Sequence, residues 1–175
     1  MSEAFLPVLF CSGPDWESKE IERFGGKYSH VATLLPGGKQ VLDARANVIG
    51  GVPAGVQVRP ASYLASPYVV DLYEIPCTAA QLEAAYRRLQ TQAGKPYDTL
   101  AIINFGIGLV SGDYEDRNWR EESAWFCDEL CVWSWEMEGI CPQLQITPNR
   151  IAPGPACLIA GALGARVSRW TAPSP

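Results

Sequence analysis

The stretch from residue 28 to residue 44 constrains the fold of this chain more than any other. Two runs of strand-forming residues flank the turn sequence PGGK at residues 36–39, which is a strong signal for a tight hairpin. With the two glycines at the tip, Ala32 pairs with Asp43 across the hairpin. Side chains alternate along a strand, so His30 lies on the same face as Asp43, as its diagonal neighbour. The sequence therefore predicts a histidine–carboxylate pair, which a one-residue slip in register would break.

A second informative stretch, residues 125–133, predicts a helix with Cys127 in its first turn. Ser123 is a candidate N-cap, and Gly139 is a candidate stop just beyond the C-terminus. The free backbone N–H groups and the macrodipole at a helix N-terminus favour the thiolate form of a cysteine. Cysteine is also among the most buried residue types, so packing in the core is the alternative interpretation of Cys127.

The single histidine of the chain leaves one candidate base for Cys127. Nucleophilic catalysis by a thiol needs a thiolate that attacks, an imidazole that holds and relays a proton, and a carboxylate that orients the imidazole. Cys127, His30 and Asp43 supply these three groups. Such triads are defined by geometry, so the order of the three residues in the chain does not matter.

The composition is that of a globular protein, because 47% of the 175 residues are hydrophobic and 19% are charged. We expect a single domain over residues 1–175. The net charge is −5 and no cluster of Lys and Arg appears, so we expect no nucleic-acid partner and no binding to anionic membrane surfaces. No run reaches the length of a transmembrane span, and the first ten residues lack the basic start of a secretory signal. We therefore expect a cytoplasmic location, with a cell envelope or a phage particle as the alternative.

The six cysteines are scattered and do not form a dense disulfide framework. Cys127 and Cys131 lie one turn apart on the same predicted helix, a spacing that suits a metal ion. A zinc site needs about four ligands, and only Cys141 and His30 are obvious additions. We therefore expect reduced cysteines, no metal and no cofactor, with a metal or redox role for the cysteine pair as the alternative.

Short strands and a few helices account for the rest of the chain. Strands are predicted at residues 5–11, 56–59, 68–75 and 166–170, with Pro76 ending the third of them, and helices at residues 79–93 and 158–165, with Thr78 capping the first. Residues 16–24 form a short helix or a loop, residues 99–110 a helix or a buried segment, and residues 111–122 a surface loop.

Four short motifs occur in a characteristic order: YSHVA at residues 28–32, VLDA at 41–44, GKPYD at 94–98 and WFCDEL at 125–130. In these motifs the chain resembles the circularly permuted NlpC-type papain-like hydrolases, a branch that includes relatives of the lecithin:retinol acyltransferases. In this family the histidine strand precedes the cysteine helix. The resemblance spans residues 28–135 and implies an α+β fold, in which an antiparallel, partly barrel-like sheet packs against the helix that carries the nucleophile.

The resemblance implies the same triad, with the cysteine as nucleophile, the histidine as base and the aspartate orienting the histidine. It also makes Tyr97 a candidate for lining the site and helping an oxyanion, and Trp125 and Phe126 candidates for contacting substrate. Many relatives have serine after the cysteine, where this chain has Asp128. A carboxylate close to the sulfur raises the pKa of the thiol and opposes its activation. Adjacent helix positions point about 100° apart, so an Asp128 that faces away from the sulfur is the alternative.

The implied function is a cysteine hydrolase that cleaves an amide bond, of peptide or peptidoglycan type, through an acyl-thioenzyme. Its partner is then a small peptide, a cell-wall fragment or an acyl substrate. Two alternatives stay open. A thioesterase or acyltransferase on lipid-like acyl groups uses the same three residues, and a catalytically silent binding or structural module of the same fold is favoured by Asp128 beside the cysteine.

Overall fold

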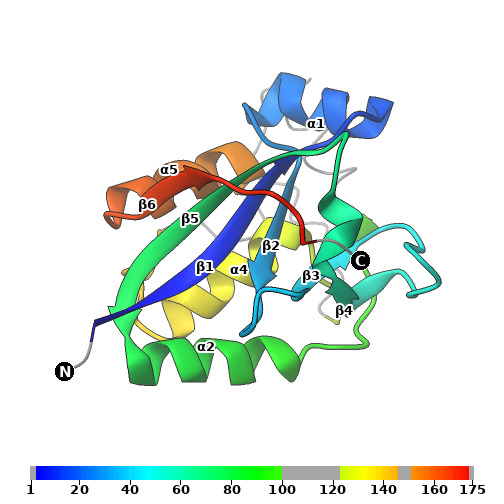
Figure 1. Cartoon of the computed structure of the whole chain (residues 1–175). Helices are drawn as coiled ribbons and strands as arrows, with labels where there is room; N and C mark the ends of the chain where they lie inside the picture. The colour runs from blue at the N-terminus through cyan, green and yellow to red at the C-terminus, as the bar shows by residue number, and fades with distance from the viewer. Residues whose placement is uncertain (1–2, 100–122, 146–150, 174–175) are drawn as a thin grey trace.

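The structure is a computed structural model that describes residues 3–99, 123–145 and 151–173 (Figure 1). Six strands form one antiparallel sheet in the order β4–β3–β2–β1–β5–β6. The strands are β1 (Glu3–Ser12), β2 (His30–Leu34), β3 (Gln40–Arg45), β4 (Gly55–Pro60), β5 (Val69–Thr78) and β6 (Arg166–Arg169). The helices are α1 (Trp16–Gly25), the 3-10 helix η1 (Ala61–Leu64), α2 (Ala79–Gln90), α4 (Cys127–Met137) and α5 (Pro153–Ala162).

Helices α2, α4 and α5 cover one face of the sheet, and η1 lies against the other (Figure 1). The central strand β1 is apolar on both sides. Leu6, Val8 and Phe10 face the three helices, whereas Leu9 and Cys11 face η1. Each such fully buried apolar side chain contributes about 1.5–3 kcal/mol to stability, which explains why this strand occupies the middle of the sheet.

The predicted hairpin forms in the predicted register. Thr33 of β2 pairs with Leu42 of β3, which is the register that sets Asp43 opposite Ala32. Both glycines at the tip have positive φ, with a value of +87° at Gly37. The Gly38 N–H donates to the Leu35 carbonyl at 3.0 Å, so Pro36 and Gly37 are the central residues of the turn. After proline such a turn needs a positive φ, which glycine adopts without steric penalty.

The N-termini of the two central helices show one prediction that is confirmed and one that is wrong. Thr78 caps α2 through a capping box, as predicted. Cys127 lies in the first turn of α4, as predicted, but the helix begins at Cys127 itself, with Phe126 and not Ser123 as its N-cap. Phenylalanine has no side-chain acceptor, and Glu129 compensates from within the first turn, because its carboxylate accepts a 3.3 Å hydrogen bond from the Phe126 backbone N–H.

Two element boundaries differ from the sequence-based expectation. Strand β5 does not end at Pro76, which pairs with Phe5 of β1. On its other side β5 pairs with β6 only through residues 71–74. Among the described strands, none lies beside Pro76 on that side to accept a hydrogen bond from a backbone N–H, so the N–H that proline lacks is not missed there. Helix α5 starts at Pro153, earlier than the predicted residue 158, because proline is well suited to the first turn of a helix.

The strand order leaves β4 and β6 at the two edges, so the sheet is open and does not close into a barrel. The mixed α+β class is confirmed, whereas the expected partial barrel is not formed by the described strands. None of the helices in the described part of the chain is long and apolar enough to cross a membrane. The predictions for residues 99–110 and 111–122 lie, from residue 100 onward, outside the described residues.

Candidate active site

His30 and Asp43 form the contact that the hairpin predicts. Nε2 of His30 lies 2.9 Å from Oδ2 of Asp43, and both side chains are buried. Ala32 and Leu34, which alternate with His30 along β2, face η1, so the pair lies on this side of the sheet. A carboxylate can only accept, so Nε2 donates the proton. In the neutral imidazole the lone pair is then on Nδ1, the nitrogen that faces away from Asp43.

Three further side chains hold Asp43 in place. Arg59 of β4 donates through Nη1 to Oδ1, and the Tyr63 hydroxyl of η1 donates to Oδ2. Nε of Arg45 lies 3.7 Å from Oδ2. The sequence contains a signal for Arg45, which follows Asp43 by two residues and shares its strand face. The positions of Arg59 and Tyr63 depend on how β4 and η1 pack, which no local pattern reveals.

These contacts give the two members of the pair opposite charge states. Burial raises the pKa of Asp43, but the hydrogen bond from His30 and the charges of His30, Arg45 and Arg59 outweigh it and lower the pKa to about 2. Burial is the largest effect on His30, and together with the Arg45 charge it lowers the pKa of the imidazole to about 4, against the opposing effect of Asp43. At neutral pH the site therefore holds a carboxylate and a neutral imidazole.

Cys127 reaches the sheet beside His30. In the described structure β2 and β3 pair only next to the hairpin turn, and nearer His30 the backbone of Val31 hydrogen-bonds the Cys127 sulfur. The Val31 side chain faces α4, and the side chain of its neighbour His30 faces η1. The Cys127 thiol and the His30 imidazole therefore approach strand β2 from opposite faces of the sheet. The described contacts of Cys127 and His30 include no hydrogen bond between the sulfur and the imidazole.

The Cys127 thiol is instead directed at the next residue. It donates to Oδ1 of Asp128 at 3.5 Å, so Asp128 does not face away from the sulfur. Burial and the nearby Asp128 carboxyl raise the pKa of Cys127 well above its usual value, and the hydrogen bond from Val31 only partly opposes them. These effects outweigh the helix N-terminus, which was expected to favour the thiolate. The resting form of Cys127 is a thiol.

The three aromatic candidates have different roles. The rings of Tyr97 and Phe126 make an edge contact with centroids 5.9 Å apart, and both pack against Cys127. Trp125 points elsewhere: its Nε1 donates to Oε1 of Gln92 at 3.1 Å, and its ring belongs to the core cluster between α4 and strands β3 and β4. Tyr97 and Phe126 therefore wall the thiol, whereas Trp125 is a packing residue.

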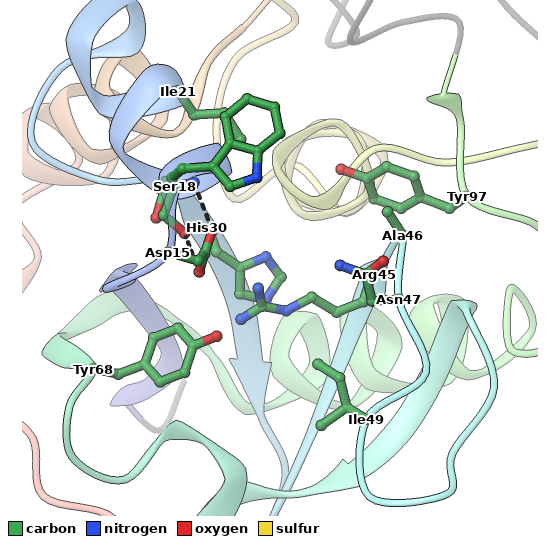
Figure 2. A pocket seen from close by; sticks show the side chains of 12 residues that line it. Asp15, Ser18, Ile21, His30, Arg45, Ala46, Asn47, Ile49, Tyr68 and Tyr97 are labelled. Carbon is green, nitrogen blue, oxygen red and sulfur yellow. Dashed lines mark hydrogen bonds between the residues drawn. The ribbon is translucent and has the colours of Figure 1, made fainter.

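A cavity of about 420 Å³ opens beside His30. Figure 2 shows the His30 ring and the Arg45 side chain pointing into it, with Tyr68 and Tyr97 on its walls. Cys127 does not line this cavity and is only 1% exposed. Tyr97 contacts both the cavity and Cys127, so it lies between the open space and the thiol.

The second cysteine of α4 belongs to the core. Sγ of Cys131 lies 3.6 Å from Oγ1 of Thr33, and the side chain is fully buried. All six cysteines are free thiols. Over residues 3–99, 123–145 and 151–173, no group of three or more His, Cys, Asp or Glu side chains is placed to hold a metal ion.

Comparison with known proteins yields a shared fold. No protein-family model matches the chain, and no curated protein matches it. Among solved structures, it is similar to the crystal structure of the metalloprotein yiiX from Escherichia coli O157:H7, described as DUF1105, with a TM-score of 0.50 and 19% sequence identity. The match covers 77% of this chain and 66% of that chain. At this identity the similarity concerns the fold alone.

Proposed function

We propose that this protein is a cysteine hydrolase that cleaves an amide bond, of peptide or peptidoglycan type, with Cys127 as nucleophile, His30 as base and Asp43 as the residue that orients His30. The observation that carries the proposal is the buried His30–Asp43 pair, with Nε2 of the imidazole 2.9 Å from the carboxylate. A buried aspartate held by two arginines and a tyrosine fixes the tautomer of the imidazole and keeps Nδ1 available as a base.

The chemical steps follow from the charge states. The neutral imidazole of His30 takes the thiol proton at Nδ1 while the Cys127 sulfur attacks the carbonyl carbon of the amide. The tetrahedral intermediate collapses, the C–N bond breaks, and the imidazolium gives its proton to the leaving amine. Water then hydrolyses the thioester, with His30 again accepting and returning a proton. Asp43 stays ionised throughout and stabilises the imidazolium.

The raised pKa of Cys127 determines which form of this mechanism applies. A thiol that is protonated at rest is not a preformed thiolate–imidazolium pair, so His30 must act as a general base during the attack. The thiol must also leave Oδ1 of Asp128 and turn toward Nδ1 of His30. The oxyanion forms on the carbonyl oxygen of the attacked amide, and the backbone N–H groups at the start of α4 are the donors we assign to it.

A second candidate function is a non-enzymatic binding module of the same fold. The burial of Cys127, which is 1% exposed, and its hydrogen bond to Asp128 favour this alternative. The similar yiiX structure is described as a metalloprotein, but the described residues of this chain offer no group of three metal-ligating side chains. We therefore do not include a metal in the proposed reaction.

An activated ester separates the two candidates. Incubation with p-nitrophenyl acetate is expected to release a burst of nitrophenolate, with one acetyl group on Cys127 by mass spectrometry. Cys127→Ala should abolish the burst, His30→Ala should slow it about 100-fold or more, and Cys131→Ala, the matched change one turn further along α4, should retain it. A burst that survives Cys127→Ala, or no acetylation of Cys127, would favour the binding module.

A further inference from the structure

We propose that the cavity beside His30 binds a carboxylate group of the substrate, and that Arg45 recognises it. This proposal rests on the proposed function, because it names the substrate class of the same site. Its starting point is the guanidinium of Arg45, of which one nitrogen, Nε, is engaged by the described residues. Nε donates to the Tyr63 hydroxyl at 3.2 Å and lies 3.7 Å from Oδ2 of Asp43.

The other two nitrogens of Arg45 make no hydrogen bond and no ion pair with the described part of the chain. Nη2 is buried and has no hydrogen-bond partner among the residues that the structure describes. The rings of Tyr63 and Tyr68 lie against the guanidinium, with centroids 5.2 and 5.6 Å from its central carbon. A guanidinium is always charged, and buried N–H donors without acceptors are energetically unfavourable. Nη1, the terminal nitrogen that is not buried, is therefore the donor that Arg45 presents to the cavity it lines.

Arg59 shows what a purely structural arginine looks like in the same cluster. Its Nη1 donates to Asp43, and its Nη2 donates to the backbone carbonyls of Pro53 and Gly55 at 2.7 and 3.2 Å. Both terminal nitrogens are thus used within the fold, the buried Nε has no hydrogen-bond partner among the described residues, and the side chain does not line the cavity. Arg45 differs because it lines the cavity and its Nη1 is neither buried nor hydrogen-bonded to the described residues.

The charged groups around the cavity limit the ligand to a single negative charge. Asp43 and Asp15 together supply two negative charges beside the two arginines, and His30 is neutral, so the charges of the cluster balance before a ligand binds. Asp15 also lines the cavity, and both of its carboxylate oxygens accept hydrogen bonds from Ser18. Its charge opposes a dianion such as a phosphate monoester. A carboxylate carries the single negative charge that this balance allows, and it accepts a charge-assisted hydrogen bond from the accessible Nη1 of Arg45.

The position of Arg45 links this recognition to the chemistry. His30 lines the same cavity, and Tyr97 connects the cavity to Cys127. A carboxylate held by Arg45 therefore lies next to the proposed base. The substrate class is a peptide or an acylated amino acid whose free carboxylate lies close to the amide that is cleaved, such as the C-terminal end of a short peptide.

Binding of N-benzoylglycine tests the proposal, measured in Cys127→Ala, which cannot turn the ligand over, as well as in the wild type, with its uncharged amide, N-benzoylglycinamide, as the matched ligand. The wild-type protein is expected to bind the acid about 10-fold or more tightly than the amide by calorimetry or ligand-observed NMR. Arg45→Gln should remove this preference, and Arg45→Lys should retain only part of it. Arg87→Gln, the same change at an exposed arginine of α2, and Cys127→Ala should leave it unchanged.

Equal binding of acid and amide to the wild-type protein, or an acid preference that survives Arg45→Gln, would overturn the proposal. The wild-type comparison holds even if an Arg45 variant fails to fold. Tighter binding of phenyl phosphate than of N-benzoylglycine would overturn the assignment to a carboxylate. If the acid preference is found but Cys127 is not acetylated by p-nitrophenyl acetate, the carboxylate site stands and the hydrolase function fails, so the two proposals are tested separately.

Discussion

The Sγ atom of Cys127 lies 3.5 Å from Oδ1 of Asp128, and the other carboxyl oxygen of Asp128 is buried with no hydrogen-bond partner in the described part of the chain. Burial raises the pKa of Asp128 well above its usual value, against the hydrogen bonds that favour its ionised form. A carboxyl group that stays protonated in the folded protein but ionises in the unfolded chain destabilises the fold as the pH rises. The residue next to the proposed nucleophile thus carries a measurable stability cost.

Asp128→Asn is expected to stabilise the protein at neutral pH. Above pH 3.8, the unfolded chain loses the Asp128 proton while the folded protein keeps it. The free energy of unfolding of the wild type then falls relative to the variant by about 1.4 kcal/mol per pH unit, until the folded pKa is reached. Urea denaturation of both proteins between pH 4 and pH 7 measures this slope. A difference that does not change with pH contradicts a raised pKa at Asp128.

Asp43→Asn is expected to have the opposite effect on stability. The variant leaves the buried Arg59 without its charged partner, which costs about 3–5 kcal/mol at neutral pH. The folded pKa of Asp43, about 2, lies below its usual value of 3.8. The stabilisation by Asp43 is therefore complete above pH 3.8 and is lost as the pH falls toward 2. Denaturation curves should show the deficit of the variant shrinking over this range, and a deficit that is small at pH 7 would contradict the role assigned to Asp43.

The titration of His30 can be followed alone, because it is the single histidine of the chain. NMR of the imidazole is expected to give a pKa of about 4 in the wild type. Because this lies below the usual 6.5, His30 lowers stability progressively as the pH falls from 6.5 to about 4. Arg45→Gln should raise the pKa by removing a nearby positive charge, and Arg87→Gln should not change it. A wild-type midpoint at 6.5 or higher would refute the buried, neutral imidazole.

Gly55 positions the turn that carries Tyr97. The φ of Gly55 is +98°, and a Cβ at this position would lie 2.3 Å from the carbonyl oxygen of Lys95. The same carbonyl accepts a 2.8 Å hydrogen bond from the N–H of Val56 in β4, which ties the turn to the sheet. Gly55→Ala should therefore destabilise the protein by about 2 kcal/mol or more. Gly37→Ala is the matched control, because its φ is also positive but nothing lies within 4 Å of the added atom.

For this pair of glycines, thermal unfolding measures the difference in stability. The Gly37 variant should show only the strain of a positive φ, about 1–2 kcal/mol. If the two variants lose the same stability, the close approach of Lys95 to Gly55 does not hold the turn in place.

The sequence predicts the hairpin and its His30–Asp43 contact because a two-glycine turn sets the register, and because the alternation of side chains along a strand then places both residues on one face. It also predicts that Cys127 lies in the first turn of a helix. The sequence does not predict on which face of the sheet the Cys127 thiol and the His30 imidazole lie. The thiol lies against the Val31 backbone, on the face opposite His30. The burial of Asp128 is likewise decided by packing: helix geometry alone leaves an N-terminal aspartate free to face solvent.

The pairing of Cys127 with His30 is tested most directly by alkylation with iodoacetamide, with the modified cysteines mapped by mass spectrometry. At pH 7 the account predicts that Cys127 is modified faster than Cys131, which is buried one turn along the same helix, and that His30→Ala slows its modification about 10-fold or more. If Cys127 is as inert as Cys131, or if its rate is the same in His30→Ala, the thiol is a packing residue and the proposed hydrolase is contradicted.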